Sequence, residues 1–235
     1  MKRLLIFLLG SILLTGCTTT ISNTVHHSIK NTPESKTPKK IIVLPANVVV
    51  SELTASGVTE EVPDWSEQGK RFVEKYVDEV VRGRPDVIMA ELPEFNPAEQ
   101  EKIDQHVALY DLVSGNALML RNQEAWNNIR EKEGYTLGDG LSFLCEKTDA
   151  ELVLIVVGRD FISSGGRKTT TFFAAALGVY IPLGRSLLHA GVVDLKTGNI
   201  LWMNTSVSET ESLNQEEDAK DMVAKVFSEY MEDKQ

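Results

Sequence analysis

The sequence predicts an α/β domain, a mixed β-sheet flanked by helices, and three observations carry that prediction. The apolar run 152–157 has the composition of a strand that is covered on both faces. Apolar pairs recur every four residues over 72–81 and 222–231, as in amphipathic helices. Residues 187–195 and 200–207 flank a short turn that contains Gly198, which indicates a hairpin. Strands mixed with helices in this way favour the α/β class.

The folded part of the chain is expected to open with a buried strand over 41–50. A bulge or strand end is expected at Pro45, because proline cannot donate a ladder hydrogen bond. Asp64 and Ser66 are candidate N-caps for the next element, an amphipathic helix. The Gly-Arg-Pro sequence at 83–85 ends that helix.

A short strand is predicted over 87–92. Asn96, Pro97 and Glu99 then have the spacing of a helix start with a capping box. The helical region that follows is expected to run towards Glu133, with a break near Gly115.

The second half is predicted to contain a short helix over 141–147 and a central strand over 151–161. After the hairpin, in which Gly198 takes a positive φ angle, the chain ends in a closing helix over 216–231. The segment 169–183 between these elements is apolar without strand-like alternation. We favour a buried strand pair or helix there. The alternative is an exposed patch, Phe172–Leu183, that contacts a second copy of the chain or dips into lipid.

The N-terminus resembles the signal sequence and lipobox of bacterial lipoproteins. Lys2 and Arg3 precede an apolar run, and Leu-Thr-Gly at 14–16 is followed by Cys17. The resemblance implies that residues 1–16 are removed and that Cys17 carries the acyl chains, palmitate among them, which hold the protein to a membrane. Thr18 stands where inner-membrane retention signals have Asp, so the resemblance favours the outer membrane, with the body facing the periplasm.

Residues 17–40 are polar and are predicted to be a disordered tether, reaching roughly 25 Å by the square-root rule for flexible chains. His26 and His27 lack further ligands at a metal spacing, so no metal site is predicted there. Residues 41–235 are then expected to form a single α/β periplasmic domain.

Composition limits the classes of partner. The net charge is −10, and removal of residues 1–16 with Lys2 and Arg3 leaves −12, which disfavours nucleic acid and anionic lipid. If Cys17 is acylated, Cys145 is the remaining cysteine and no intrachain disulfide can form. We expect Cys145 to be a small buried apolar residue.

Enzyme signatures are missing from the sequence. It contains no G-x-S-x-G, H-E-x-x-H, Walker phosphate loop or C-x-x-C pattern, and the glycines around 158–169 lack phosphate-loop spacing. We therefore predict no catalytic, cofactor-binding or metal-binding residue, and a non-enzymatic protein.

The hairpin carries a further resemblance. Residues 194–202, Asp-Leu-Lys-Thr-Gly-Asn-Ile-Leu-Trp, resemble the D-x-x-T-G-x-[IV]-x-W hairpin of envelope lipoproteins related to the curli secretion channel CsgG. The N-terminal domain of TolB and the lipoprotein activators of penicillin-binding proteins resemble the same group. The resemblance implies a Rossmann-like, frequently oligomeric body. It also implies an accessory or scaffold role in envelope transport, secretion or cell-wall assembly.

Two other classes of function stay open. One is a regulator that activates an envelope enzyme such as a peptidoglycan synthase. The other is a hydrolase or ligand-binding enzyme whose site carries no recognisable motif.

Overall fold

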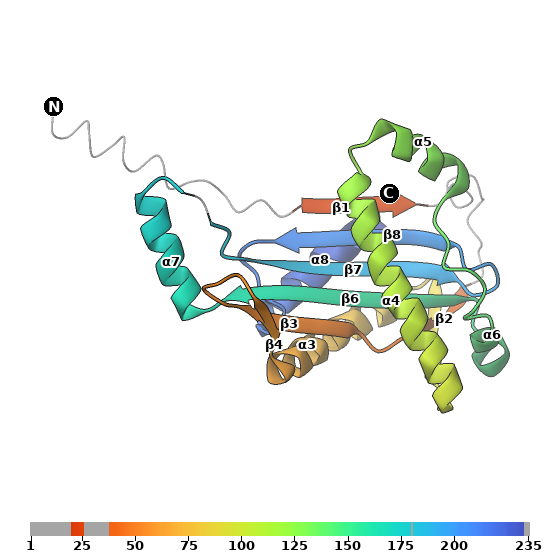
Figure 1. Cartoon of the computed structure of the whole chain (residues 1–235). Coiled ribbons are helices and arrows are strands. Elements are labelled where there is room, and N and C mark those ends of the chain that lie inside the picture. The colour runs from red at the N-terminus through yellow and green to blue at the C-terminus, as the bar shows by residue number, and fades with distance from the viewer. Residues whose placement is uncertain (1–19, 26–37, 180, 233–235) are drawn as a thin grey trace.

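The computed structural model describes residues 20–25, 38–179 and 181–232 (Figure 1). Its eight strands form one sheet, in which six follow the order β1-β8-β7-β6-β2-β5. Strand β3 pairs with the same edge of β6 as β2 does, but further along β6, and β4 pairs with β3. The strands are β1 (Thr20–Val25), β2 (Lys39–Val43), β3 (Asn47–Leu53), β4 (Thr59–Glu61), β5 (Val87–Met89), β6 (Leu152–Ser163), β7 (Gly184–Asp194) and β8 (Ile200–Ser208). Strand β6 runs parallel to β2 and β3 and antiparallel to β7, so the sheet is mixed.

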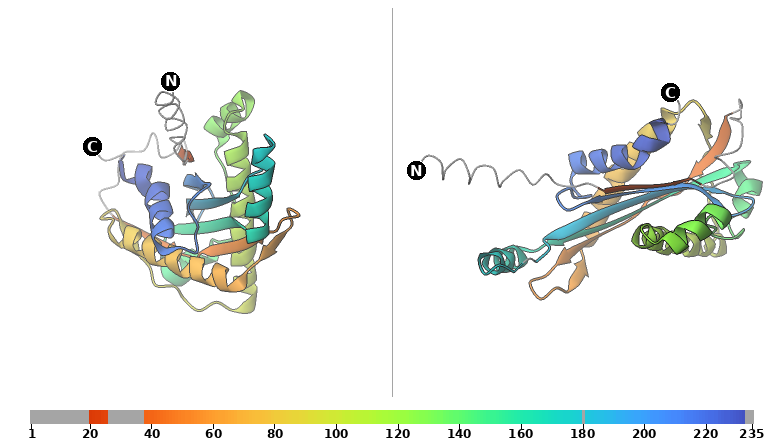
Figure 2. Two further views of the ribbon diagram at one scale, coloured as in Figure 1. Left: turned by 90° about the vertical axis from the view of Figure 1, so that its left-hand side faces the viewer. Right: turned by 90° about the horizontal axis from the view of Figure 1, so that it is seen from above.

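Helices cover both faces of this sheet, which confirms the predicted α/β class (Figure 2). They are α3 (Pro63–Arg82), α4 (Pro97–Leu120), α5 (Glu124–Glu133), α6 (Phe143–Thr148), α7 (Gly165–Ala176) and α8 (Glu216–Glu232). Helices α3 and α8 pack against one face and α4 crosses the other (Figures 1 and 2). Two apolar cores result, one on each side of the sheet.

The strongest predictions from local sequence are confirmed. Strand β6 is central, with β7 on one side and β2 and β3 on the other. Strands β7 and β8 form the expected hairpin, and Gly198 has φ +71° in its turn. A Cβ atom at Gly198 would lie 1.9 Å from the carbonyl oxygen of Gly138, so glycine is required for a second reason, the close approach of another loop.

Two local predictions are wrong in detail. The helix expected to break near Gly115 continues to Leu120, and the break before α5 comes at 121–123. Helix α3 starts at Pro63 without a side-chain cap from Asp64 or Ser66, and Ser66 is instead buried and accepts a hydrogen bond from the backbone N–H of Val50. The fixed φ of Pro63 suits the first helical turn, which accounts for the earlier start.

The larger correction concerns the predicted tether. Residues 20–25 form β1, which pairs antiparallel with β8 along its whole length, from Thr20 opposite Val207 to Val25 opposite Trp202. Polar composition argued for a free chain, but an edge strand has unpaired backbone groups that accept a polar strand. Residues 1–19 and 26–37, including Cys17, His26 and His27, lie outside the described residues.

Candidate functional site

The sheet has one end at which β1 begins, β6 ends, β7 begins and β8 ends, and we call it the anchored end. Strand register defines it, since Thr20 is opposite Val207 of β8, and Gly184 of β7 is opposite Ile162 of β6. Helix α7 leaves the sheet here, directly after β6, and projects beyond the strands (Figures 1 and 2). The predicted acylation site, Cys17, precedes Thr20 by three residues.

Helix α7 overturns the favoured prediction for the 169–183 segment. The hydroxyl of Ser164 caps the helix by accepting a hydrogen bond from the N–H of Arg167. None of the helix's residues is buried. Phe172 and Phe173 are 72% and 62% exposed, and Leu177, just after the helix, is 82% exposed. The segment is an exposed apolar surface because no other element of the described chain packs over these side chains.

The chain that follows α7 is fastened at its return to the sheet. The guanidinium of Arg167 donates to the carbonyl oxygen of Pro182 from Nε and Nη2, at 3.2 and 3.0 Å. The Ser163 hydroxyl donates to the carbonyl oxygen of Leu183. These contacts fasten the returning chain to the first turn of α7 and to the end of β6.

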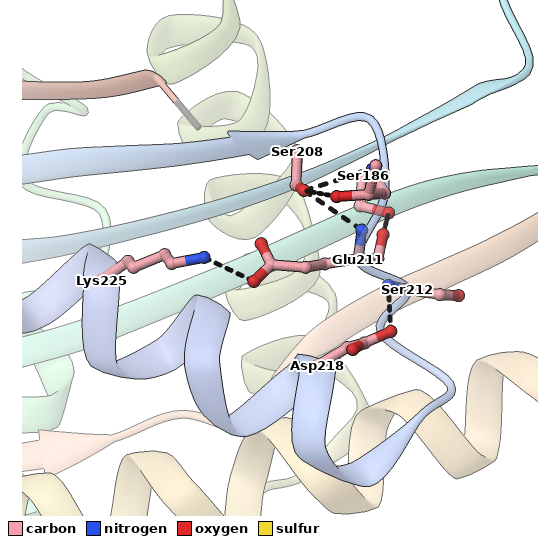
Figure 3. A network of polar contacts seen from close by, with 7 residues as sticks. Ser186, Ser208, Glu211, Ser212, Asp218 and Lys225 are labelled. Carbon is pink, nitrogen blue, oxygen red and sulfur yellow. Dashed lines mark hydrogen bonds and ion pairs between the residues drawn. The ribbon is translucent and has the colours of Figure 1, made fainter. Parts of the chain in front are cut away.

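A buried polar cluster lies beside this end and fixes the loop between β8 and α8. The Asp160 carboxylate accepts hydrogen bonds from the Ser212 hydroxyl at 2.7 Å and from the Leu213 N–H at 2.8 Å. Figure 3 shows the neighbouring contacts, in which Glu211 pairs with Lys225 and Asp218 accepts from the Ser212 N–H. These contacts join β6, the loop and α8.

The proton count in this cluster is unusual. Ser186 Oγ lies 2.7 Å from Asp160 Oδ1 and 2.5 Å from the carbonyl oxygen of Glu211. The Ser186 hydroxyl has one hydrogen, which it can donate either to Asp160 or to the Glu211 carbonyl. If Asp160 is protonated, its carboxyl group can donate to Ser186 while Ser186 donates to Glu211. Burial raises the pKa of Asp160, while the serine hydroxyls that donate to its carboxylate oppose the shift. Ser186 is 1% exposed, and its contacts with Asp160 and Glu211 hold the loop against β6 and β7.

His189 is a buried titratable side chain at the middle of β7, opposite Val157 of β6. Its Nδ1 lies 2.8 Å from the Thr205 hydroxyl, and it is 2% exposed. Burial lowers the pKa of His189 to about 4, so the ring is neutral at pH 7. Its position inside the sheet layer gives it a packing role.

A cleft of about 700 Å³ lies at the carboxyl ends of β2 and β5, where open α/β sheets commonly bind ligands. Its polar lining comes from Glu74, Asp78, Arg82 and Glu91. Glu74 accepts the Ala46 N–H at 3.1 Å, and Arg82 pairs with Asp78 at 2.7 Å. The remaining acidic lining suits a basic group. The sequence offered no signal for this cleft, because its lining comes from four separate segments.

Helix α4 buries one apolar face and carries exposed apolar residues among polar ones on the other. Its inner face buries Ile103, Val107 and Tyr110 against the sheet. Its outer face carries Leu109, Leu112 and Met119, with exposures of 39%, 65% and 80%. We call these three residues the α4 outer row. An amphipathic surface helix is usually polar on its outer face, so this row has the composition of a contact surface.

Cys145, the other cysteine that the sequence singles out, does not belong to any of these sites. Cys145 is half-buried against the α4-side core, and burial raises the pKa of its thiol. Within the described ranges, no three His, Cys, Asp or Glu side chains are grouped to hold a metal ion. No helix of the described chain is long and apolar enough to cross a bilayer.

Comparison with known proteins adds little. No protein-family model matches this chain, and no curated protein matches it. Two crystal structures of PelC from Paraburkholderia phytofirmans align over 90% of this chain and 96% of their own, at 13% and 14% identity. Their TM-scores are 0.39 and 0.36, and both are described as dodecamers.

Proposed function

We propose that this chain is a non-enzymatic, lipid-anchored accessory or scaffold subunit of a transport, secretion or cell-wall assembly complex. It is held on the outer membrane through acylated Cys17, and its α/β body faces the periplasm. Two sequence resemblances support this location, that of residues 14–17 to a lipobox and that of the 194–202 hairpin to CsgG-like lipoproteins. The proposal treats residues 1–16 as a removed signal peptide and residues 41–235 as one domain.

The observation that carries the accessory role is the α4 outer row. Leu112 and Met119 are seven residues apart, so they lie on one face of the helix, and both are mostly exposed. Their exposure to water is unfavourable unless a partner covers them at least part of the time. A protein that works by holding another protein needs a surface of this kind, whereas a catalytic centre needs convergent polar groups.

Lipidation is tested first. Cys17→Ser is expected to abolish incorporation of labelled palmitate and to release the protein from membranes washed with high salt, or to leave an unprocessed precursor. Cys145→Ser is the matched control, because it removes the other cysteine of the chain. If Cys17→Ser still carries label and stays on membranes, the anchor is elsewhere and the proposed location is wrong.

The partner surface is tested in cells with a photoreactive residue at Leu112 or Met119. The control position is Glu79 of α3, which is also exposed but lies on the opposite face of the sheet. We expect one discrete adduct from both α4 positions and none from position 79. Failure to obtain an adduct specific to the α4 outer row would contradict the accessory role.

The identity of the adduct separates the remaining alternatives. A second copy of this chain would support a homo-oligomeric scaffold. A peptidoglycan synthase or another envelope enzyme would instead support the regulator alternative, since the same surface would then act on an enzyme. Mass spectrometry of the crosslinked band distinguishes the two.

A further inference from the structure

We propose that α7 and residues 177–179 and 181–183 rest on the lipid bilayer beside the acyl chains of Cys17, so that the body stands on the membrane by the anchored end of its sheet. This inference rests on the proposed acylation of Cys17. It adds a second membrane contact and a fixed orientation, which a single flexible anchor would not provide.

Cys17 cannot lie far from the folded body. Because β1 is paired to β8 from Thr20 onward, only Thr18 and Thr19 stand between Cys17 and the body, so Cys17 is three residue steps from Thr20. A chain of three residues spans at most about 11 Å, far less than a free tether would. The acyl chains must therefore enter the bilayer close to the start of β1.

Helix α7 lies close to the start of β1. Three strand spacings, from β1 through β8 and β7 to β6, separate Thr20 from the strand that leads into α7. At roughly 4.7–4.9 Å per spacing, this is about 14 Å. Because β1 begins at the end of the sheet where β6 ends, a membrane that holds the acyl chains also lies against α7.

The anchored end is rich in exposed apolar side chains. Five of the eleven exposed large apolar side chains in the described chain lie between 172 and 183, and Val58, in the neighbouring β3–β4 turn, is a sixth. Helix α7 has 12 residues, about 18 Å at roughly 1.5 Å per residue, so it can lie in the interface but not span the bilayer.

The residues in and around α7 carry positive charge. The chain has a net charge of −10, yet residues 165–185 contain Arg167, Lys168 and Arg185 and no acidic residue. This local reversal suits anionic headgroups, which attract basic side chains next to an apolar face. Overall acidity argued against anionic lipid as a partner. The exposed acidic side chains of Glu60, Glu61 and Glu209 also lie at this end, so the attraction is confined to the part of the surface that α7 and its flanking residues form.

These features favour lipid over a second copy as the occupant of the α7 surface. A second copy carries the same basic segment, so two α7 segments in contact would bring six like charges together. The same orientation directs the β7–β8 turn, which lies at the opposite end of the sheet, into the periplasm. It leaves α4, which crosses one face of the sheet, free for a protein partner (Figure 1).

The experiment places a tryptophan on α7 in the full, lipidated protein purified from envelopes. Phe172→Trp is compared with Ile88→Trp, which lies on β5 near the opposite end and is 55% exposed. Both proteins are reconstituted into vesicles of phosphatidylethanolamine and phosphatidylglycerol whose acyl chains are either brominated or unmodified. Trp65, Trp126 and Trp202 give the same background in both variants.

We expect brominated lipid to remove most of the emission that the tryptophan at position 172 adds, and to leave the emission from position 88 unchanged. If the protein floats with the vesicles but the added emission at position 172 is not quenched, the α7 contact is wrong while the anchor stands. If instead that emission responds only to protein concentration, a second copy covers α7 and the inference is overturned. If the protein does not float at all, the proposed function fails together with the inference.

Discussion

Helices α7 and α8 make an instructive pair, because both are amphipathic and both follow directly from a strand or its loop, yet only one is covered. Helix α8 buries Met222, Val223, Val226 and Phe227 to 2% exposure or less. The Phe227 ring stacks on Trp202 of β8 with the centroids 5.6 Å apart. Helix α7 buries nothing. An apolar row therefore identifies a face that needs a partner without saying whether the partner is the same chain.

The connections to the sheet account for the difference. The loop before α8 is fixed to β6 by Asp160 and to α8 by Asp218 and Lys225, which directs the helix back over the sheet. The corresponding contacts of α7, from Ser164 and Arg167, tie only its own ends. Helix α7 consequently lies beyond the ends of the strands and across their direction, where it covers neither face of the sheet (Figures 1 and 2).

The largest expected effect is on the covered helix. Phe227→Ala removes a fully buried ring and should lower the free energy of unfolding by about 3–5 kcal/mol, measured by urea denaturation. Exposed Asp221 on the same helix provides a control, and Asp221→Ala should change stability by about 0.5 kcal/mol or less. A small loss for Phe227→Ala would mean that α8 is no better packed than α7.

The second prediction concerns pH. The folded-state pKa of His189, about 4, lies below its ordinary value of 6.5, so folding favours the neutral ring. That stability is complete above pH 6.5 and is lost as pH falls towards 4, by roughly 3 kcal/mol in all.

The test compares wild type with His189→Gln by urea unfolding at about pH 7 and about pH 4. The titratable or charged groups around this region are Asp111, Arg159, Arg185 and Asp160. Both proteins contain them, so the difference between the two changes in unfolding free energy isolates the contribution of His189. We expect the wild type to lose more stability than the variant. Equal losses would show that the His189 ring is not shielded in the folded protein.

The third prediction concerns the clamp that directs α8. Asp160→Ala leaves the buried Leu213 N–H without its acceptor and removes one of the two acceptors of the Ser186 and Ser212 hydroxyls, and should cost about 2 kcal/mol. Asp160→Asn should cost less, because an amide can donate to Ser186 and still accept from Leu213, as a protonated carboxyl does.

The sign of the pH dependence checks this interpretation. The pKa of Asp160 is raised on folding, so its contribution is complete below its ordinary value of 3.8 and is lost as pH rises through the folded value. The stability of Asp160→Asn relative to wild type should therefore improve as pH rises, measured by the difference in unfolding free energy. A constant difference would mean that no proton is shared in the cluster.

The smallest effect is expected on α7. Phe172→Ala should change the free energy of unfolding by about 0.5 kcal/mol or less, since the ring is 72% exposed and touches mainly Phe173. The same urea measurement serves here. A loss as large as that of Phe227→Ala would show that α7 packs against the body in solution, and the contrast between the two helices would disappear.

Predictions from local sequence succeeded where the determining interactions are local. The Asn96–Glu99 capping box, the turn at Gly198 and the unbroken apolar composition of β6 each depend on neighbouring residues. The prediction failed for residues 20–25, which were expected to be free, because the pairing partner of β1 is β8, which lies far along the chain at Ile200–Ser208.

The candidate sites show the same division. Cys17 was predicted from a contiguous pattern, and its acylation remains a prediction. The acidic cleft, the Asp160 cluster and the α4 outer row each combine residues or faces that only packing brings into relation. A helix with apolar residues on two faces, such as α4, does not reveal from its sequence which face the sheet will take.

The sequence by itself determined the α/β class, the central strand, the closing hairpin and helix, and the presence of an apolar segment at 169–183, because composition and periodicity are properties of contiguous residues. Only the tertiary structure decided that α7 stays exposed and that β1 brings residue 20 to the same end of the sheet. The physical reason is that burial and strand pairing depend on which distant segments compete for the same surface, and that competition is settled only when the whole chain packs.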